Sequence, residues 1–152
     1  MSNQRVREAV EETAVRLGEN PELGRDPDTP ATATFEKGVR MRVEGPNDWE
    51  VATDHGESVG GTETASNLGW FLRGSIAACD WTVVRVEVSK RGIELTRLEV
   101  TVESESDSRG SMGLGENVPA GLSEVRIHFR LGSDDATADE LEALLEWTDA
   151  HS

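Results

Sequence analysis

The sequence predicts a mixed fold of the α+β class around one hydrophobic core, and three observations support this. Alternating apolar and polar residues predict strands over residues 31–53, and again over 93–104 and 122–131. A long apolar segment, residues 66–91, separates these groups of strands, and a helix signal begins at Thr137. A chain of 152 residues is long enough for one domain with its own core.

Residues 1–30 predict a helix followed by an irregular loop. Apolar residues recur at helical spacing within residues 3–17, and Gly18 follows as a helix stop. Prolines and aspartates then break any regular pattern as far as Pro30. This part of the chain therefore precedes the main fold as a separate short helix and loop.

Residues 31–36 and 39–44 predict a β-hairpin with its turn at residues 37–38. Successive side chains of a strand point to opposite faces, so Arg40 and Arg42 are expected to share the face away from the core. A further turn leads to a third strand over residues 49–53, and a Gly-rich loop follows over residues 54–65. Acids in loops are usually solvated, and we expect this for Asp54 and Glu57.

The apolar segment 66–91 gives two conflicting signals. Ser66 or Asn67 is a plausible helix N-cap, and apolar residues then occupy every helical face, which is typical of a helix buried in a core or an interface. Towards its end, however, valines at positions 84, 86 and 88 alternate with charged residues, which locally predicts a strand. On local evidence alone the segment divides near residue 82.

The last part of the chain predicts two long strands and a helix. Residues 93–104 and 122–131 alternate, and His128 falls on the solvent face of its strand. The sequence Thr137-Ala-Asp-Glu140 matches a capping box, in which the first and last side chains satisfy each other's backbone N–H groups. We therefore expect the C-terminal helix to begin at Thr137.

The composition is strongly acidic, with 30 acidic and 15 basic residues and a formal net charge of −15. Only Lys37 and Lys90 are lysines, and the chain has no tyrosine. We interpret this as a halophilic surface, because at ~1 M salt the Debye length falls to about 3 Å and screens repulsion between carboxylates. The alternative is an ordinary acidic protein. The same charge argues against a nucleic-acid partner, which requires a clustered basic patch.

The cysteine count, the apolar segments and the histidine spacing restrict where the protein is located and which chemistry it can perform. Cys79 is the only cysteine, so the chain forms no internal disulfide. No apolar run reaches the ~18 residues of a membrane span, and residues 2–8 lack the apolar region of a signal peptide, so we expect a cytoplasmic protein without membrane contact. His55, His128 and His151 are scattered without metal-ligand spacing, and we expect no metal and no cofactor.

Several short motifs occur in an order that resembles the OsmC/Ohr family. They are Gly60-Gly61 before the apolar segment, Ile76-Ala-Ala-Cys79 within it, Arg91-Gly92-Ile93-Glu-Leu at its end, and Asp107-Ser-Arg-Gly110 after the next strand. The resemblance covers residues 31–152, the OsmC-like domain, and leaves out residues 1–30. It implies an α+β fold whose antiparallel sheets wrap around buried central helices in an intertwined homodimer, and it favours one helix over 66–91.

The resemblance also implies a chemistry, the thiol-dependent reduction of organic hydroperoxides in a stress response. Cys79 matches the peroxidatic cysteine, which attacks the O–O bond and becomes a sulfenic acid. Arg40 is the best match to the arginine that assists this cysteine, with Arg42 as the next. A nearby cation favours the reactive thiolate, so this pairing is chemically reasonable. An external thiol reductant would complete the cycle.

This sequence departs from the family pattern at two positions. The assisting helical glutamate would fall at Gly69 and the second cysteine at Ser152. Glu63 in the loop could reach the site in place of that glutamate, but nothing in the sequence requires it to. The alternative is a non-catalytic homodimer of the same family, which binds a small apolar ligand or has a structural role. Cys79 would then be a buried structural thiol, and Arg40 a solvated strand residue.

Overall fold

The computed structural model describes residues 3–152, which form two compact units. One unit combines the N-terminal helix, up to Gly18, with Ser75–Ser152, and the other is Glu19–Gly74. The long helix α2, Leu68–Arg91, begins in the second unit and continues into the first. The sequence predicted a different division, into residues 1–30 and an OsmC-like domain of residues 31–152. That division follows the extent of the family resemblance, and it stays a prediction.

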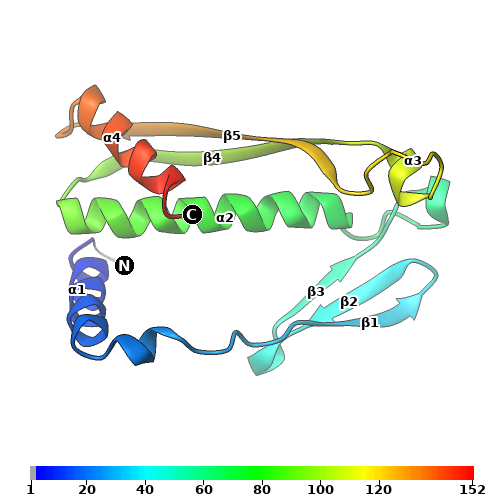
Figure 1. The fold of residues 1–152 in the computed structure, drawn as a ribbon, viewed down its shortest axis with the longest axis horizontal. Coiled ribbons are helices and arrows are strands. Elements are labelled where there is room, and N and C mark those ends of the chain that lie inside the picture. The colour runs from blue at the N-terminus through cyan, green and yellow to red at the C-terminus, as the bar shows by residue number, and fades with distance from the viewer. Residues whose placement is uncertain (1–2) are drawn as a thin grey trace. The chain divides into compact units, whose positions relative to one another are not determined.

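The unit Glu19–Gly74 contains a three-stranded antiparallel sheet. Its strands, in spatial order, are β1 (Thr32–Lys37), β2 (Arg40–Glu44) and β3 (Glu50–Thr53), as Figure 1 shows. Gly38 occupies the hairpin turn with φ of +60°, a conformation that glycine adopts at no steric cost. The predicted hairpin and third strand are therefore confirmed within one or two residues.

One face of this sheet is apolar and uncovered in the single chain. Phe35 pairs with Met41 and Val43 pairs with Val51, so their side chains lie on the same face. Phe35 is 74% exposed, and Val51 is exposed as well. An apolar sheet face normally packs on another layer, so this face is a surface that requires a cover.

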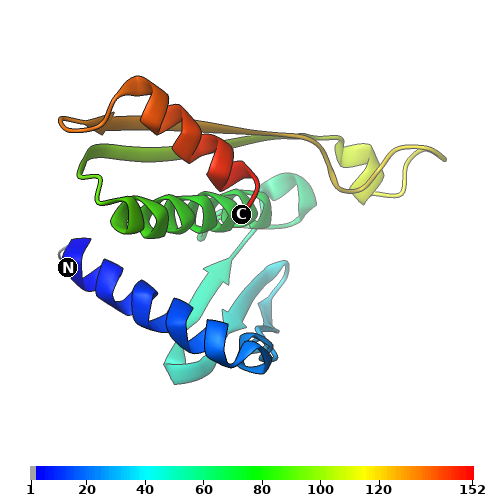
Figure 2. The ribbon, with the colours of Figure 1, turned by 60° about the vertical axis from the view of Figure 1, so that its left-hand side comes forward.

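The other unit is built on helix α2 and a long two-stranded sheet. The antiparallel strands β4 (Leu95–Ser106) and β5 (Leu122–Ser133) lie along one side of α2, and α4 (Ala138–Asp149) crosses near the start of β4 (Figures 1 and 2). The core residues Val84, Val88 and Leu144 are fully buried here. Partly buried apolar side chains of β4, β5 and α4 pack against them.

Helix α2 runs without a break through the segment where the valines predicted a strand. Val84 and Val88 lie one turn apart and pack on α4 and the sheet, so tertiary burial outweighs their preference for strands. At the start of α2, Asn67 Oδ1 accepts the N–H of Trp70 at 2.8 Å. At its end, Gly92 has φ of +74° and Ile93 donates its N–H to Val88, which closes a Schellman motif.

The terminal helices differ in how firmly they are held. Helix α1 (Asn3–Glu19) has no fully buried residue and is attached to the end of α2 by polar contacts, including one from Arg7 Nε to the Ser89 carbonyl at 2.7 Å. Helix α4 has the predicted capping box, with Thr137 and Glu140 bonded reciprocally. Its apolar stripe faces the core through Leu144.

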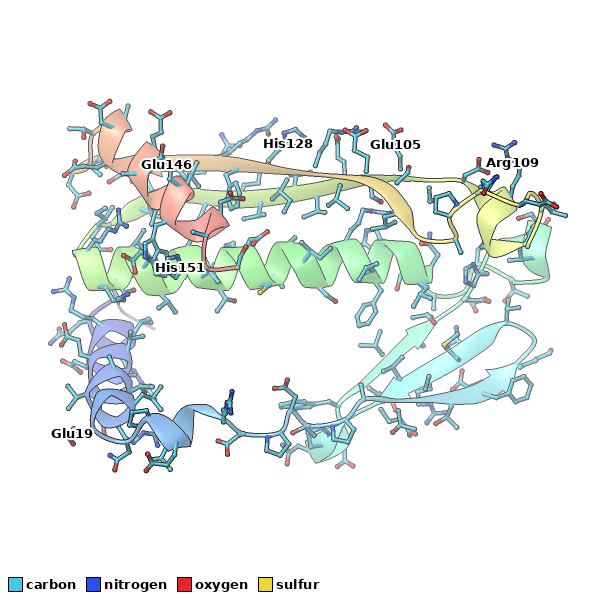
Figure 3. The ribbon with its side chains drawn as sticks, in the orientation of Figure 1. Glu19, Glu105, Arg109, His128, Glu146 and His151 are labelled. Atoms are coloured by element: carbon cyan, nitrogen blue, oxygen red, sulfur yellow. The ribbon has the colours of Figure 1, made fainter. Side chains whose placement is uncertain are left out.

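The outer face of the β4–β5 sheet is charged. Figure 3 shows Glu105 and His128 pointing away from α2, and His128 is exposed as predicted. Arg126 pairs with Glu105 at 2.9 Å and with Glu124 at 2.6 Å. The short helix α3 (Ser108–Ser111) lies in the loop between the strands. Among residues 3–152, no helix has both the length and the apolar character that crossing a bilayer demands.

Candidate functional site

Cys79 lies in the middle of α2, and its side chain is exposed in this chain. Asp80, Val84 and Val88 form the buried side of the helix. Successive helical residues are about 100° apart, so Cys79 projects away from that side. Burial of this thiol was expected for a homodimer under the non-catalytic alternative, and that stays a prediction because the structure describes a single chain. Trp81, beside it on the helix, is also 45% exposed.

Asp80 follows Cys79 in the sequence and lies on the buried side of α2. It is only 3% exposed, and among the described residues its Oδ2 has no hydrogen-bond partner. A buried oxygen atom without a hydrogen-bond partner costs stability. Because consecutive residues of a helix point about 100° apart, Asp80 faces the core and Cys79 faces away from it, so the two side chains do not form a pair.

Arg40 and Arg42 lie on the same face of the hairpin β1–β2, as strand alternation predicted. Glu36 accepts hydrogen bonds from both side chains. Arg40 Nε donates to Glu36 Oε2 at 2.8 Å, and Arg42 Nε and Nη2 donate to Glu36 Oε1 at 2.9 and 2.6 Å. The strand register shifts between Phe35 and Lys37, which leaves Glu36 outside the ladder. Hydrogen bonds from Arg42 and then Arg40 lower the pKa of Glu36, and Glu36 raises the pKa of Arg42.

Asp54 is not solvated, and this corrects the expectation from the sequence. Its side chain is 1% exposed, and it accepts hydrogen bonds from the backbone of His55 and from the backbone and hydroxyl groups of Thr62 and Thr64. These donors, the Thr64 N–H first and the Thr62 hydroxyl next, hold the pKa of Asp54 well below its usual range. Asp54 is thus an ionised group that orders the loop before α2.

The two glycines of the Gly60-Gly61 motif allow this loop to close around Asp54. A Cβ atom on Gly61 would lie 1.8 Å from the His55 carbonyl oxygen, so only glycine fits there. Gly60 has φ of +84°, which favours glycine for a different reason. Glu57, in the same loop, is exposed as predicted. The motif is therefore explained by backbone packing rather than by ligand contact.

The loop and the hairpin meet at Arg40. Arg40 Nη1 donates to Thr64 Oγ1 at 2.9 Å, and the Thr64 hydroxyl donates in turn to Asp54 Oδ2 at 3.0 Å. Glu36, Arg40, Thr64 and Asp54 form a connected set that we call the Arg40 network. Sequence analysis missed all its members except Arg40. The hairpin pairing could have identified Glu36, but nothing in the loop sequence indicates Asp54 or Thr64.

The other residues singled out in the sequence do not join this network. Glu63 is exposed, and among the described residues it makes no hydrogen bond to Arg40. Gly69 offers no side chain, and Ser152 is an exposed C-terminal residue. Cys79 belongs to the unit Ser75–Ser152 and Arg40 to the other, so the structure does not place them in one described site. Within residues 3–152, no three His, Cys, Asp or Glu side chains gather as a metal site.

Comparison with known proteins identifies relatives of this fold. Residues 70–152 match the family model described as "OsmC-like protein". That match covers more than half of the chain and includes the segment that carries Cys79. No curated protein matches the chain.

Solved structures match over most of the chain. An OsmC-like protein from Mycoplasma pneumoniae superposes with a TM-score of 0.69 at 16% identity, over 84% of each chain. An organic hydroperoxide resistance protein OsmC from Legionella pneumophila gives 0.62 at 20% identity, over 83% of this chain and 85% of that one. An organic hydroperoxide resistance protein from Elizabethkingia anophelis gives 0.60 at 21% identity, over 83% and 89%. At these identities the likeness shows a shared fold.

Proposed function

The chain belongs to the family of OsmC-like proteins, and on that premise we propose that it is a stress-response thiol peroxidase that reduces organic hydroperoxides. The observation that carries the proposal is the position of Cys79, the only thiol of the chain, on helix α2 within the residues that match the family model. A thiol is the group that this peroxidase chemistry requires, because its thiolate attacks the O–O bond.

The proposed reaction has two steps and needs an external thiol. The Cys79 thiolate attacks the terminal oxygen of the hydroperoxide, the O–O bond breaks, and the alkoxide takes up a proton to leave as an alcohol. Cys79 is left as a sulfenic acid. Because the chain has no second cysteine, an external dithiol condenses with the sulfenic acid, releases water, and reduces the mixed disulfide with its second thiol.

Arg40 is the cation that we propose for this chemistry. Its guanidinium is held by Glu36 and Thr64, so its positive charge has a defined place on the hairpin. A cation of this kind favours a thiolate and stabilises negative charge on the leaving oxygen. A hollow of about 260 Å³ beside Arg40, lined by apolar residues that include Phe35 and Met41, suits the organic part of a hydroperoxide.

We also propose that the active form is a homodimer. The exposed side of α2 around Trp81 and the apolar face of the β1–β3 sheet around Phe35 are both uncovered in the single chain. A second copy of the chain offers the matching apolar surfaces that would cover them. We propose the cytoplasm of a salt-loving cell as the setting of this dimer, and the acidic composition supports the salt-loving part of that proposal.

Peroxide consumption tests the proposed function. We expect the wild type in molar KCl to consume cumene hydroperoxide with dithiothreitol as the reductant, and Cys79→Ser to consume none above the background reaction. Arg40→Met should lower the rate roughly 100-fold, the size of effect seen when one charge-stabilising donor is removed. A wild-type rate equal to that of Cys79→Ser would contradict the proposal.

The second candidate is a non-catalytic dimer that binds a small apolar ligand. The lack of a second cysteine favours it, because the chain alone cannot resolve a sulfenic acid as a disulfide. The glycine at position 69 also removes the family's assisting acid. In this case the peroxide assay would show no Cys79-dependent turnover, and cumyl alcohol, which lacks the peroxide bond, would bind as tightly as cumene hydroperoxide.

A further inference from the structure

We propose that Asp54 is a positioning residue for Arg40 and acts on it through the Thr64 hydroxyl group. The inference rests on the proposed function, which makes Arg40 the cation of the reaction. Asp54 would be the group that, through Thr64, fixes the orientation of the Arg40 guanidinium. No part of it requires Asp54 to touch the substrate.

The first step is the state of Asp54. A carboxylate that is 1% exposed and surrounded by donors is held as an anion that only accepts hydrogen bonds. Its Oδ2 accepts the Thr64 backbone N–H at 3.1 Å and the Thr64 hydroxyl at 3.0 Å. Two bonds to one residue fix both the backbone and the side chain of Thr64.

The second step is the direction of the Thr64 hydroxyl proton. A threonine hydroxyl has one hydrogen to donate and two lone pairs that accept. The anionic Asp54 draws the hydrogen towards itself, so the lone pairs of Thr64 Oγ1 are left for Arg40 Nη1 at 2.9 Å. The chain of bonds from Arg40 through Thr64 to Asp54 therefore has a fixed polarity, and the negative charge strengthens both bonds.

The third step is the effect on the guanidinium. Glu36 shares its carboxylate with Arg42, so it holds Arg40 through Nε alone, and this contact does not oppose the slow flip about the partly double Nε–Cζ bond that exchanges Nη1 and Nη2. The Thr64 contact at Nη1 opposes this flip. Among the described residues Nη2 has no protein partner, and it is left in a fixed direction for an acceptor.

The chain offers a matched control for this contact. Thr62 also donates its backbone N–H and its hydroxyl to Asp54 Oδ2, at 3.2 and 2.8 Å, but it makes no bond to Arg40. Thr62→Val and Thr64→Val therefore each remove one hydroxyl bond to Asp54 and the 3.3 Å contact between the two hydroxyl groups, and only Thr64→Val also removes the contact with Arg40. Thr64→Ser keeps the hydroxyl and serves as the rescue.

The rate of Cys79 oxidation by cumene hydroperoxide is the first readout, measured by intact mass in molar KCl. Thr64→Val should lower the second-order rate constant about 10- to 100-fold, because small misplacements of a reacting group cost this much. Thr62→Val and Thr64→Ser should stay near the wild type. If Thr62→Val and Thr64→Val lower the rate constant equally, Asp54 has no positioning role towards Arg40. Its hydrogen bonds would then only stabilise the loop.

Side-chain NMR of arginine is the second readout and does not depend on activity. In the wild type, Arg40 should give separate signals for its two Nη groups, because rotation is blocked. They should merge in Thr64→Val and stay separate in Thr62→Val, with Arg40→Lys identifying the signals. If the wild type does not react with peroxide, the proposed function fails. The NMR signals then decide by themselves whether Thr64 fixes the orientation of the Arg40 guanidinium. Merged signals in the wild type would overturn it.

Discussion

Asp54 shows how a single side chain connects the site with the stability of the protein. Hydrogen bonds from the loop lower its pKa in the folded protein below 3.8, the value expected without them. A group with a lowered folded pKa contributes stability that is fully present above its unfolded pKa. This contribution is lost as the pH falls through the folded pKa. The loop before α2 should therefore lose part of its support in strong acid.

We predict that Asp54→Asn destabilises the protein at pH 7 and that the difference from the wild type shrinks as the pH falls below about 4. Urea unfolding in molar KCl at a series of pH values measures this difference. Glu57→Gln is the matched control, because Glu57 is an exposed acid of the same loop. A difference for Asp54→Asn that stays constant from neutral to acid pH would contradict the assigned role of its charge.

The sequence predicts part of the candidate site. The common face of Arg40 and Arg42 follows from strand alternation, because that pattern is local. The burial of Asp54 could not be predicted in the same way. It depends on a loop that closes through the absence of a Cβ at Gly61 and on donors ten residues further along the chain, at Thr64. Such contacts come from the folded backbone rather than from residue type.

At the scale of elements, the end of α2 gives a test of helix termination. Gly92 has φ of +74°, and a Cβ atom there would lie 2.9 Å from Arg7 Nη2, at the point where α1 contacts α2. Gly92→Ala should therefore lower the free energy of unfolding by about 1–2 kcal/mol, the cost of a left-handed conformation for an L-residue. Thermal unfolding measures it, with Gly18→Ala as the control because nothing lies near its Cβ position. Equal stability of the two variants would contradict the Schellman ending.

The same helix shows where prediction from local sequence fails. The valines near the end of α2 predicted a strand, and only the family resemblance favoured a helix. The structure explains the outcome, because Val84 and Val88 are fully buried against Leu144, which lies far away in the sequence. The capping box at Thr137 was predicted correctly, because both of its partners lie within one helical turn.

At the scale of the whole molecule, the uncovered apolar surfaces predict a dimer. We expect light scattering in molar KCl to give twice the chain mass of 16.5 kDa for the wild type and a single chain mass for Trp81→Glu. In Trp81→Glu the new carboxylate would be buried at the dimer interface without a partner, which costs enough free energy to prevent association. His128→Glu adds an acid to the exposed outer face of β5 and should stay dimeric. A monomeric wild type would refute the proposed assembly.

The charge of −15 predicts that stability depends on salt. Repulsion between carboxylates is screened in molar KCl and restored at low ionic strength, so the melting temperature should fall by several degrees when KCl is removed. Calorimetry at a series of KCl concentrations measures this, with sucrose as a control for water activity. A melting temperature that is independent of KCl would contradict the halophilic interpretation and favour an ordinary acidic protein.

The most direct test of the central claim is the trapping of the sulfenic acid on Cys79. Wild type and Cys79→Ser are treated with a low concentration of cumene hydroperoxide in molar KCl with dimedone present, and their intact masses are measured. The peroxidase account predicts one dimedone adduct on the wild type and none on Cys79→Ser. A folded, dimeric wild type that acquires no adduct would contradict it and leave the binding role.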